Sequence, residues 1–279
     1  MGGLKVLERA QGLGSGDHAS WAYATPAAFH EAVTDYLADG AERGERLVYV
    51  GSARTGELAD HLAGMPERDR LLDDGRLTLY PLEALYTVDE PLDPHVQVGV
   101  FHGEAAQALA DGFAGLRVAG DITELAQDPA LLPQLLEYEL AVDAMLLANT
   151  AVGLCGFDVS RVGARWTQIS ALHVLQHTEV SEPMFAVNLH SDAVEVIGEV
   201  DISNTSDLEQ ILHAVSSVTD GPLVVRLPDL EFIDVAGTRV LARFQQGMSA
   251  AGRSVDFEDL SHAAHRTLRL FGLADGTRR

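Results

Sequence analysis

The chain has 279 residues, 47% of them hydrophobic, and its 42 acidic residues outnumber its 19 basic residues to give a formal net charge of −23. This length suggests two domains of ordinary size, and the apolar content suffices for packed cores. The acidity disfavours nucleic acid and anionic membranes as partners, because both are bound through Lys and Arg contacts with phosphate. A charged surface that keeps the protein in solution explains the acidity more simply.

The sequence carries no sign of a membrane span or of secretion. It contains no stretch of roughly 18 uncharged apolar residues, and charge comes too early at the N-terminus for a secretory signal. The single cysteine, Cys155, excludes an intrachain disulfide. We therefore expect a cytoplasmic protein. The bias toward Arg and Ala, with Lys5 as the only lysine, is typical of a high-GC bacterial genome.

In the N-terminal half, apolar runs typical of buried strands alternate with amphipathic segments typical of helices. We expect strands at 46–50, 77–80, 96–101, 115–120 and 152–157, and helices at 26–42, 58–62, 104–112 and 131–149. This order favours an α/β sheet that is covered by helices on both faces.

The stretch 177–183 breaks this pattern and predicts a linker. We therefore expect an N-terminal domain at 1–178, a linker at 179–184 and a C-terminal domain at 185–279. The second domain should contain an antiparallel strand pair at 185–189 and 194–200, a helix at 206–218 capped by Ser206 or Asp207, strands at 223–227 and 254–257, and a helix at 262–271.

The stretch 232–241, F-I-D-V-A-G-T-R-V-L, is the most informative in the chain. It begins like the end of an apolar strand, Gly237 allows a tight turn, and apolar residues then recur at helical spacing. The turn therefore exposes Asp234, Val235 and Ala236 at the start of a helix. Free backbone N–H groups and the helix dipole favour an anion at such a place.

This stretch resembles the signature loop of the STAS domains of anti-sigma factor antagonists. The segments G-E-V-D-I at 198–202 and L-R-L-F-G-L at 268–273 fit the same family in the expected order, so the resemblance covers about 184–275. It implies a STAS α/β domain with a mixed sheet. It also implies that the loop from Asp234 to Thr238 binds an anti-sigma factor of the serine-kinase type or another STAS protein.

The loop lacks the phosphate acceptor that this family typically carries. Antagonists usually have Asp-Ser-Ser/Thr-Gly there, and a partner kinase phosphorylates the second hydroxyl residue, but Val235 and Ala236 occupy those positions here. Ala236 offers no oxygen for phosphorylation, and we expect none at Thr238, which lies two positions later. The domain is then a constitutive binder or a scaffold, and Asp234 caps the helix, contacts the partner, or does both.

The segment 51–58, G-S-A-R-T-G-E-L, follows an expected strand and opens a helix. Gly51 and Gly56 have the spacing of a phosphate-binding loop, but Glu57 and Leu58 stand where such a loop has Lys and Ser or Thr. A carboxylate repels phosphate and leucine cannot bind magnesium, so we expect no ATP hydrolysis. An ordinary strand–turn–helix junction and a nucleotide-binding fold without its phosphate chemistry are both compatible with this segment.

A second resemblance covers about 15–178. His18, G-F-A-G-L-R-V-A-G-D at 112–121, E-Y-E-L at 137–140 and L-C-G-F-D at 154–158 are similar to the MEDS sensory domain of methanogen and methylotroph regulators. This resemblance implies a three-layer RecA-like α/β domain that senses a small molecule. The chain departs from the family at Phe157, where tyrosine is common.

The MEDS resemblance implies that four polar residues line a ligand pocket at the strand ends, where α/β sheets usually bind ligands. These residues are His18, Arg117, Glu139 and Cys155. Each also has a purely structural explanation. His18 and Cys155 fit buried positions, and Arg117 and Glu139 fit an ion pair between a strand and a helix.

The sequence predicts neither a metal site nor an enzyme. His173 and His177 are four residues apart, with Glu179 nearby, but we expect them to be surface residues at a helix end rather than zinc ligands. No G-x-S-x-G motif is present, and Cys155 with a distant histidine is too little for a cysteine hydrolase. We expect no catalytic residues and no cofactor.

The whole pattern predicts a two-domain bacterial signalling regulator that acts in transcription regulation. A MEDS-like sensor that binds a ligand would alter exposure of the STAS loop around Asp234. Two alternatives remain, a weak or degenerate nucleotide-binding protein and a ligand-free structural component of a sensory assembly. A homo-oligomer formed through a sheet edge is compatible with each of them.

Overall fold

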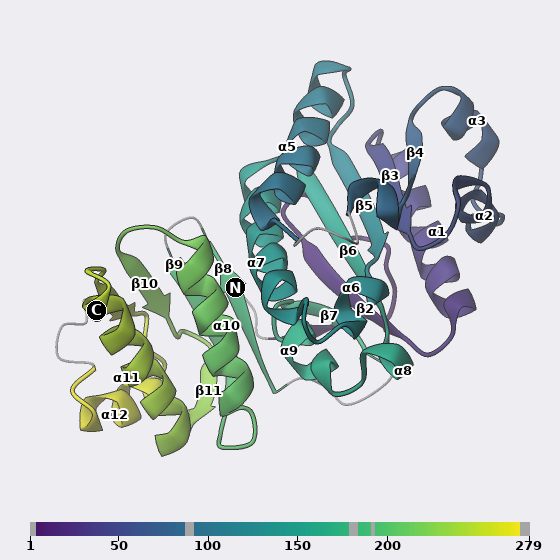
Figure 1. Ribbon diagram of the computed structural model, residues 1–279. Coiled ribbons are helices and arrows are strands. Elements are labelled where there is room, and N and C mark those ends of the chain that lie inside the picture. Colours follow the sequence, from purple (N-terminus) through teal and green to yellow (C-terminus); the bar gives the residue numbers. More distant parts are fainter. Residues whose placement is uncertain (1–3, 87–91, 179–183, 191–192, 274–279) are drawn as a thin grey trace.

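The computed structural model describes residues 4–86, 92–178, 184–190 and 193–273, which form two α/β units, each with its own sheet (Figure 1). The N-terminal sheet has seven parallel strands in the order β1-β7-β2-β6-β5-β3-β4. Their bounds are β1 Lys5–Val6, β2 His18–Tyr23, β3 Arg46–Gly51, β4 Leu77–Pro81, β5 Leu116–Asp121, β6 Ala151–Asp158 and β7 Leu175–His177.

Helices cover both faces of this sheet, as the alternation of side chains along its strands requires. On β3, Leu47 and Tyr49 pack with α1 (Pro26–Glu42), whereas Val48 and Val50 join the cluster that contains α5 (Pro94–Ala110) and α7 (Leu132–Ala148). Shorter helices connect the strands: α2 Thr55–His61, α3 Arg68–Asp73, α4 Leu82–Leu85, α6 Thr123–Gln127, α8 Val159–Val162, a 3-10 turn Gly163–Arg165 and α9 Trp166–Ser170.

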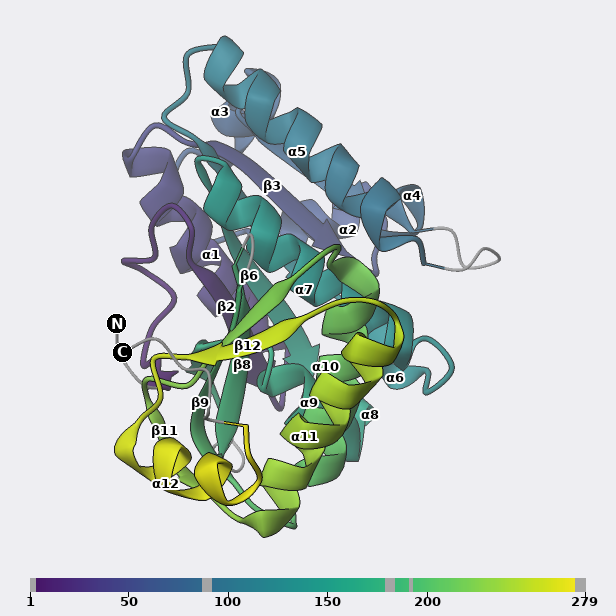
Figure 2. The ribbon, with the colours of Figure 1, turned by 90° about the vertical axis from the view of Figure 1, so that its left-hand side faces the viewer.

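The C-terminal unit has a mixed five-stranded sheet. β8 (Phe185–Leu189) pairs antiparallel with β9 (Ala193–Val200), and the other pairings are parallel. The remaining strands are β10 Leu223–Arg226, β11 Leu230–Ile233 and β12 Val255–Glu258. Helices α10 (Thr205–Val218) and α11 (Val235–Ala250) lie side by side over the sheet, and α12 (His262–Leu270) packs against β11 (Figure 2).

Helix α7 joins the two units. It packs on the N-terminal sheet and also against α10 and β8 of the C-terminal unit (Figure 1). Ten of its 17 residues are buried, and one continuous apolar cluster includes side chains from both units. The backbone N–H of Val187 in β8 donates to the carbonyl of Ala171, 2.6 Å away, immediately after α9. The two sheets are therefore packed through α7 and the α9 region.

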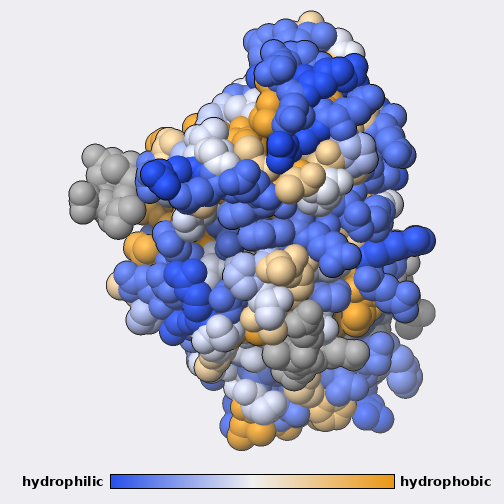
Figure 3. All heavy atoms as spheres, turned by 90° about the vertical axis from the view of Figure 1, so that its right-hand side faces the viewer, coloured by the Kyte–Doolittle hydropathy of each residue, from blue (hydrophilic) through white to orange (hydrophobic). Residues whose placement is uncertain are grey.

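The surface agrees with the acidic composition. The face in Figure 3 is mainly hydrophilic, with apolar residues scattered in small groups, as expected for a charged, solvated exterior. Among the described residues, no helix combines the length and apolar character needed to cross a bilayer.

Most expected elements are present, and two expectations were wrong. Residues 96–101 are helical rather than a strand, because Asp93 accepts from the N–H groups of His95 and Val96, and Pro94 then begins α5. Neither Ser206 nor Asp207 caps α10, which starts one residue earlier. Its N-terminal flanking residue, Asn204, makes no cap bond and instead donates to the carbonyl of Glu199. The predicted linker at 179–184 lies outside the described residues, except for Met184.

Candidate functional site

Four side chains with nitrogen, oxygen or sulfur ligand atoms meet between the N-terminal sheet and α7. His18 begins β2, Cys155 lies on the neighbouring strand β6, Glu139 comes from α7, and His173 follows α9. Their ligand atoms all lie within 4.8 Å of one another. We call these four residues the buried cluster, since only Cys155 is partly exposed.

A single oxygen of Glu139 is the centre of the buried cluster. Glu139 Oε2 lies 3.3 Å from His18 Nε2, 3.4 Å from His173 Nε2 and 3.8 Å from Cys155 Sγ. His18 Nε2 is also 3.4 Å from Cys155 Sγ. Two imidazole nitrogens, a sulfur and a carboxylate oxygen thus face one another in a small volume.

The outer nitrogen of each histidine is held by a second group. His18 Nδ1 lies 2.7 Å from Asp143 Oδ1, one turn after Glu139 on α7. His173 Nδ1 lies 3.0 Å from the carbonyl oxygen of Ile169, to which it donates. Because each Nδ1 is occupied in this way, both Nε2 atoms point into the buried cluster.

Burial and neighbouring groups act in opposite directions on these side chains. Burial alone would raise the pKa of Glu139, but the neighbouring imidazoles of His173 and His18 lower it to about 2. Burial alone would lower the pKa of His18, but Cys155 and the hydrogen bond to Asp143 raise it well above its ordinary value. Burial, reinforced by Glu139, raises the pKa of Cys155 to about 11.

Two cavities reach the buried cluster. One, of about 350 Å³, lies between the two units and is lined by His18 and Asp143 on one side and by residues of β8 and β9, such as Glu195, on the other. A much smaller apolar cavity, of about 40 Å³, is lined by Cys155 and by residues of α7 and β5. The cluster therefore has a polar route to the boundary between the units and an apolar space beside its sulfur.

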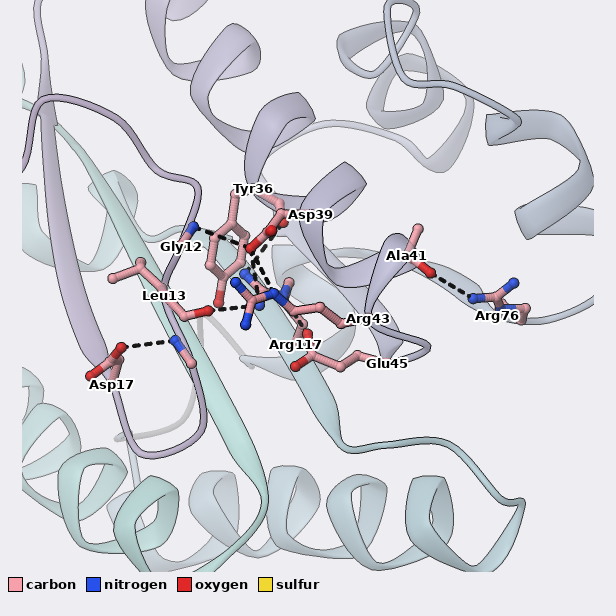
Figure 4. Close-up of polar contacts among 11 residues, drawn as sticks. Gly12, Leu13, Asp17, Tyr36, Asp39, Ala41, Arg43, Glu45, Arg76 and Arg117 are labelled. Carbon is pink, nitrogen blue, oxygen red and sulfur yellow. Dashed lines mark hydrogen bonds and ion pairs between the residues drawn. The ribbon is translucent and has the colours of Figure 1, made fainter.

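Arg117 does not belong to this site, contrary to expectation. It is fully buried under α1, where its guanidinium lies 2.5 Å from Glu45 and 3.5 Å from Asp39 and donates to the carbonyl of Leu13 (Figure 4). The expected ion pair between Arg117 and Glu139 is therefore also wrong. Side chains alternate along a strand, so Arg117 points to the face of the sheet opposite Cys155.

The expected placement of His173 and His177 was also wrong. They do not share a helix face, because α9 ends at Ser170 and His177 lies on β7. His173 is 1% exposed and faces the buried cluster, whereas His177 stacks on Trp21 and bonds the carbonyl of Leu7. Glu179 lies outside the described residues. In the sequence, nothing but its being a histidine marked His173 as a member of the site. Asp143 was missed, although it lies four residues after Glu139 and therefore on the same side of the helix.

The segment 51–58 forms a strand–turn–helix junction, as expected. Gly51 ends β3, and Leu58, which stands in place of a magnesium-binding hydroxyl, is fully buried. Glu57 pairs with Arg54 at the surface. A Cβ on Gly51 would lie 2.8 Å from a Leu58 methyl group, so this glycine serves close packing of helix on strand.

The loop at 234–238 has the geometry of a capped helix start. Asp234 accepts from the N–H of Gly237 at 2.8 Å and from the N–H of Ile202 at 3.1 Å. A Cβ on Gly237 would lie 2.7 Å from Val200, so the helix can approach β9 only with glycine there. Thr238 is fully buried, and its hydroxyl donates to the carbonyl of Asp234.

Apolar side chains surround this capped loop on the surface. Val235 in the loop is 49% exposed, Phe232 just before it is 48% exposed, and Ile202, whose N–H binds Asp234, is 78% exposed. Exposed apolar groups of this kind are characteristic of interaction surfaces when they gather at one place.

Comparison with known proteins identifies both units. The family of MEDS domains, described as the methanogen/methylotroph, DcmR sensory domain, matches residues 17–174, and the MlaB-type STAS domain matches residues 184–277. The chain therefore belongs to the MEDS family and carries a C-terminal STAS domain. Both resemblances seen in the sequence are confirmed.

A similar solved structure is that of the anti-sigma factor antagonist SpoIIAA in its unphosphorylated form, at 15% identity and a TM-score of 0.30, covering 34% of this chain and 85% of that one. No curated protein sequence matches the chain.

Proposed function

We propose that this chain is a bacterial cytoplasmic signalling regulator in which the MEDS domain controls the binding of a protein partner to the STAS loop. The observation that carries the proposal is the loop itself. It keeps a capped helix start at Asp234 and is surrounded by the exposed side chains of Ile202, Phe232 and Val235, but has Ala236 at the acceptor position. The partner is an anti-sigma factor of the serine-kinase type or another STAS protein, and the output is transcription regulation.

Regulation in this proposal comes from the MEDS domain rather than from phosphorylation. Ala236 has no oxygen, and the hydroxyl of Thr238 is buried and bonded to the backbone. The MEDS domain touches the STAS domain through α7 and α10, and α10 begins shortly after Ile202. A ligand that binds more tightly to one packing of α7 on α10 shifts the protein toward that packing. The resulting change in affinity for the partner is limited by the ratio of the ligand's affinities for the two packings.

The proposal includes no catalytic step. At the junction after β3, Glu57, which pairs with Arg54 at the surface, and the buried Leu58 occupy the two positions where a phosphate-binding loop has Lys and Ser or Thr. Isothermal titration with ATP and magnesium tests this part directly. We expect no heat of binding, whereas saturable binding would favour the nucleotide-binding alternative.

The partner-binding part is tested with charge substitutions of exposed apolar residues. Val235→Asp should abolish capture of the partner from a lysate of the source bacterium, and Leu109→Asp on α5 is the matched control because Leu109 is equally exposed, at 47%. Mass spectrometry should identify a kinase-type anti-sigma factor or a STAS protein among the proteins captured by the wild type and by Leu109→Asp. It should not identify such a partner among the proteins captured by Val235→Asp. Equal capture by all three proteins would show that the loop is not the binding surface.

A further inference from the structure

We propose that the buried cluster is a binding site for one divalent transition-metal ion of the zinc type, with His18 Nε2, His173 Nε2, Glu139 Oε2 and Cys155 Sγ as its ligands. The sequence predicted no metal site, and this inference does not depend on the proposed function of the STAS loop. It rests on ligand chemistry, ligand spacing, the second-shell contacts and the charge of the site.

The ligand types select the class of metal. Imidazole nitrogen and cysteine sulfur bind zinc and its neighbours in the first transition row, whereas magnesium and calcium take oxygen ligands. Four protein ligands of this mixed kind fill a tetrahedral coordination sphere. The buried cluster provides that number from β2, β6, α7 and the turn after α9.

The spacing fits a tetrahedron. Bond lengths of about 2.0–2.3 Å at a tetrahedral zinc ion place neighbouring ligand atoms roughly 3.3–3.8 Å apart. The four measured separations, 3.3 Å, 3.4 Å, 3.4 Å and 3.8 Å, fall in this range, and all remaining ones are within 4.8 Å. Small side-chain shifts are sufficient to close the site around an ion.

The second shell is already in place. Histidine ligands of metals usually donate their other ring nitrogen to a carboxylate or a backbone carbonyl, which fixes the ring and its tautomer. Asp143 does this for His18 and the carbonyl of Ile169 does it for His173. In the described part of the chain, His173 Nε2 has no hydrogen-bond partner although it is buried and faces Glu139, which is the state of an unused ligand atom.

Charge gives an independent reason for a cation. Glu139 and Asp143 are 0% and 4% exposed, and burying two carboxylates is costly unless positive charge compensates them. Glu139 Oε1 and Asp143 Oδ2 are also without hydrogen bonds among the described atoms. A divalent ion bound by Glu139 Oε2 would place positive charge directly against this carboxylate, and Asp143 would be held next to the ion through His18. The polar cavity that His18 and Asp143 line provides an entry route.

The alternative is a hydrogen-bonded polar cluster without metal, and cobalt separates the two. The full chain, stripped with a chelator, should bind one equivalent of Co²⁺ and develop the visible bands of tetrahedral cobalt together with a near-ultraviolet thiolate-to-cobalt band. Zn²⁺ should bleach both. Cys155→Ser should lose the thiolate band, and His173→Ala should lose stoichiometric binding, whereas His102→Ala, an exposed histidine on α5, should match the wild type. No stoichiometric cobalt spectrum with the wild type, or an unchanged thiolate band in Cys155→Ser, would overturn the proposal.

A second measurement needs no variant and therefore does not depend on correct folding of a mutant. Cys155 is the single cysteine, so alkylation by iodoacetamide reports on this sulfur alone. One equivalent of Zn²⁺ should slow alkylation at least tenfold, and excess chelator should restore the rate. An equal rate with and without Zn²⁺ would overturn the assignment of Cys155 as a ligand.

Discussion

Arg117→Met should destabilise the protein strongly, because the structure makes Arg117 a structural cation rather than a ligand-binding group. The substitution keeps much of the side-chain volume but leaves Glu45 and Asp39 without their shared partner, and removes a donor from the carbonyl of Leu13 (Figure 4). Removing one member of a buried ion pair costs roughly 3–5 kcal/mol. Glu45 and Asp39 keep 12% and 18% of their side-chain exposure, so water screens them in part and we expect the lower end, about 3 kcal/mol.

Urea unfolding followed by far-ultraviolet circular dichroism measures this loss. The free energy of unfolding falls linearly with urea concentration, with a slope of up to about 3 kcal/mol per M. With that slope, a loss of about 3 kcal/mol lowers the unfolding midpoint by about 1 M urea. Arg43→Ala is the matched control, because Arg43 binds the same Asp39 from a side chain that is 43% exposed, and such pairs contribute under about 1 kcal/mol. Adding Glu45→Leu to Arg117→Met should recover part of the loss, since it removes one unpaired charge. Equal midpoints for Arg117→Met and Arg43→Ala would refute the reasoning.

Three further predictions concern the STAS domain. Gly237→Ala should lower the free energy of unfolding by about 1–3 kcal/mol, because the added methyl would overlap Val200, and an unchanged melting temperature would contradict this. Asp234→Ala should cost about 1 kcal/mol through loss of the cap, with Asp234→Asn retaining most of the stability; equal urea midpoints for the wild type and the alanine variant would count against a capping role. After incubation with a partner kinase, intact mass should show no phosphate on Thr238, since its hydroxyl is buried, and a gain of one phosphate there would be decisive against this.

The sequence revealed those parts of the fold whose local pattern and tertiary role agree. Arg46–Gly51 was predictable because a strand buried on both faces is a continuous apolar run, and Pro26–Glu42 because its apolar residues recur at helical spacing. Strand β2, H-A-S-W-A-Y, was missed although it lies inside the sheet, because its buried positions include the polar residues His18 and Ser20. The run V-Q-V-G-V-F alternates like a strand, but its capped start made it a helix.

The candidate site was only partly predictable. The MEDS resemblance named three of its members, which are His18, Glu139 and Cys155, but it also included Arg117, and only strand pairing shows which face each residue occupies. Gly120 is the pairing partner of Cys155, so Arg117, three residues earlier, points to the opposite face. His173 comes from a turn whose direction depends on where α9 ends, which no local pattern fixed.

Helix α7 makes the two domains poor candidates for separation. One of its sides presents Glu139 and Asp143 to His18. It also packs against α10, where Gln210, His213 and Ala214 line a space together with residues of α7. A STAS fragment cut from this chain would lose these contacts and expose Ala214, which is buried in the full chain, to water. In evolution, a replacement STAS domain would have to bring a matching α10 surface with it, so the two modules are constrained to change together.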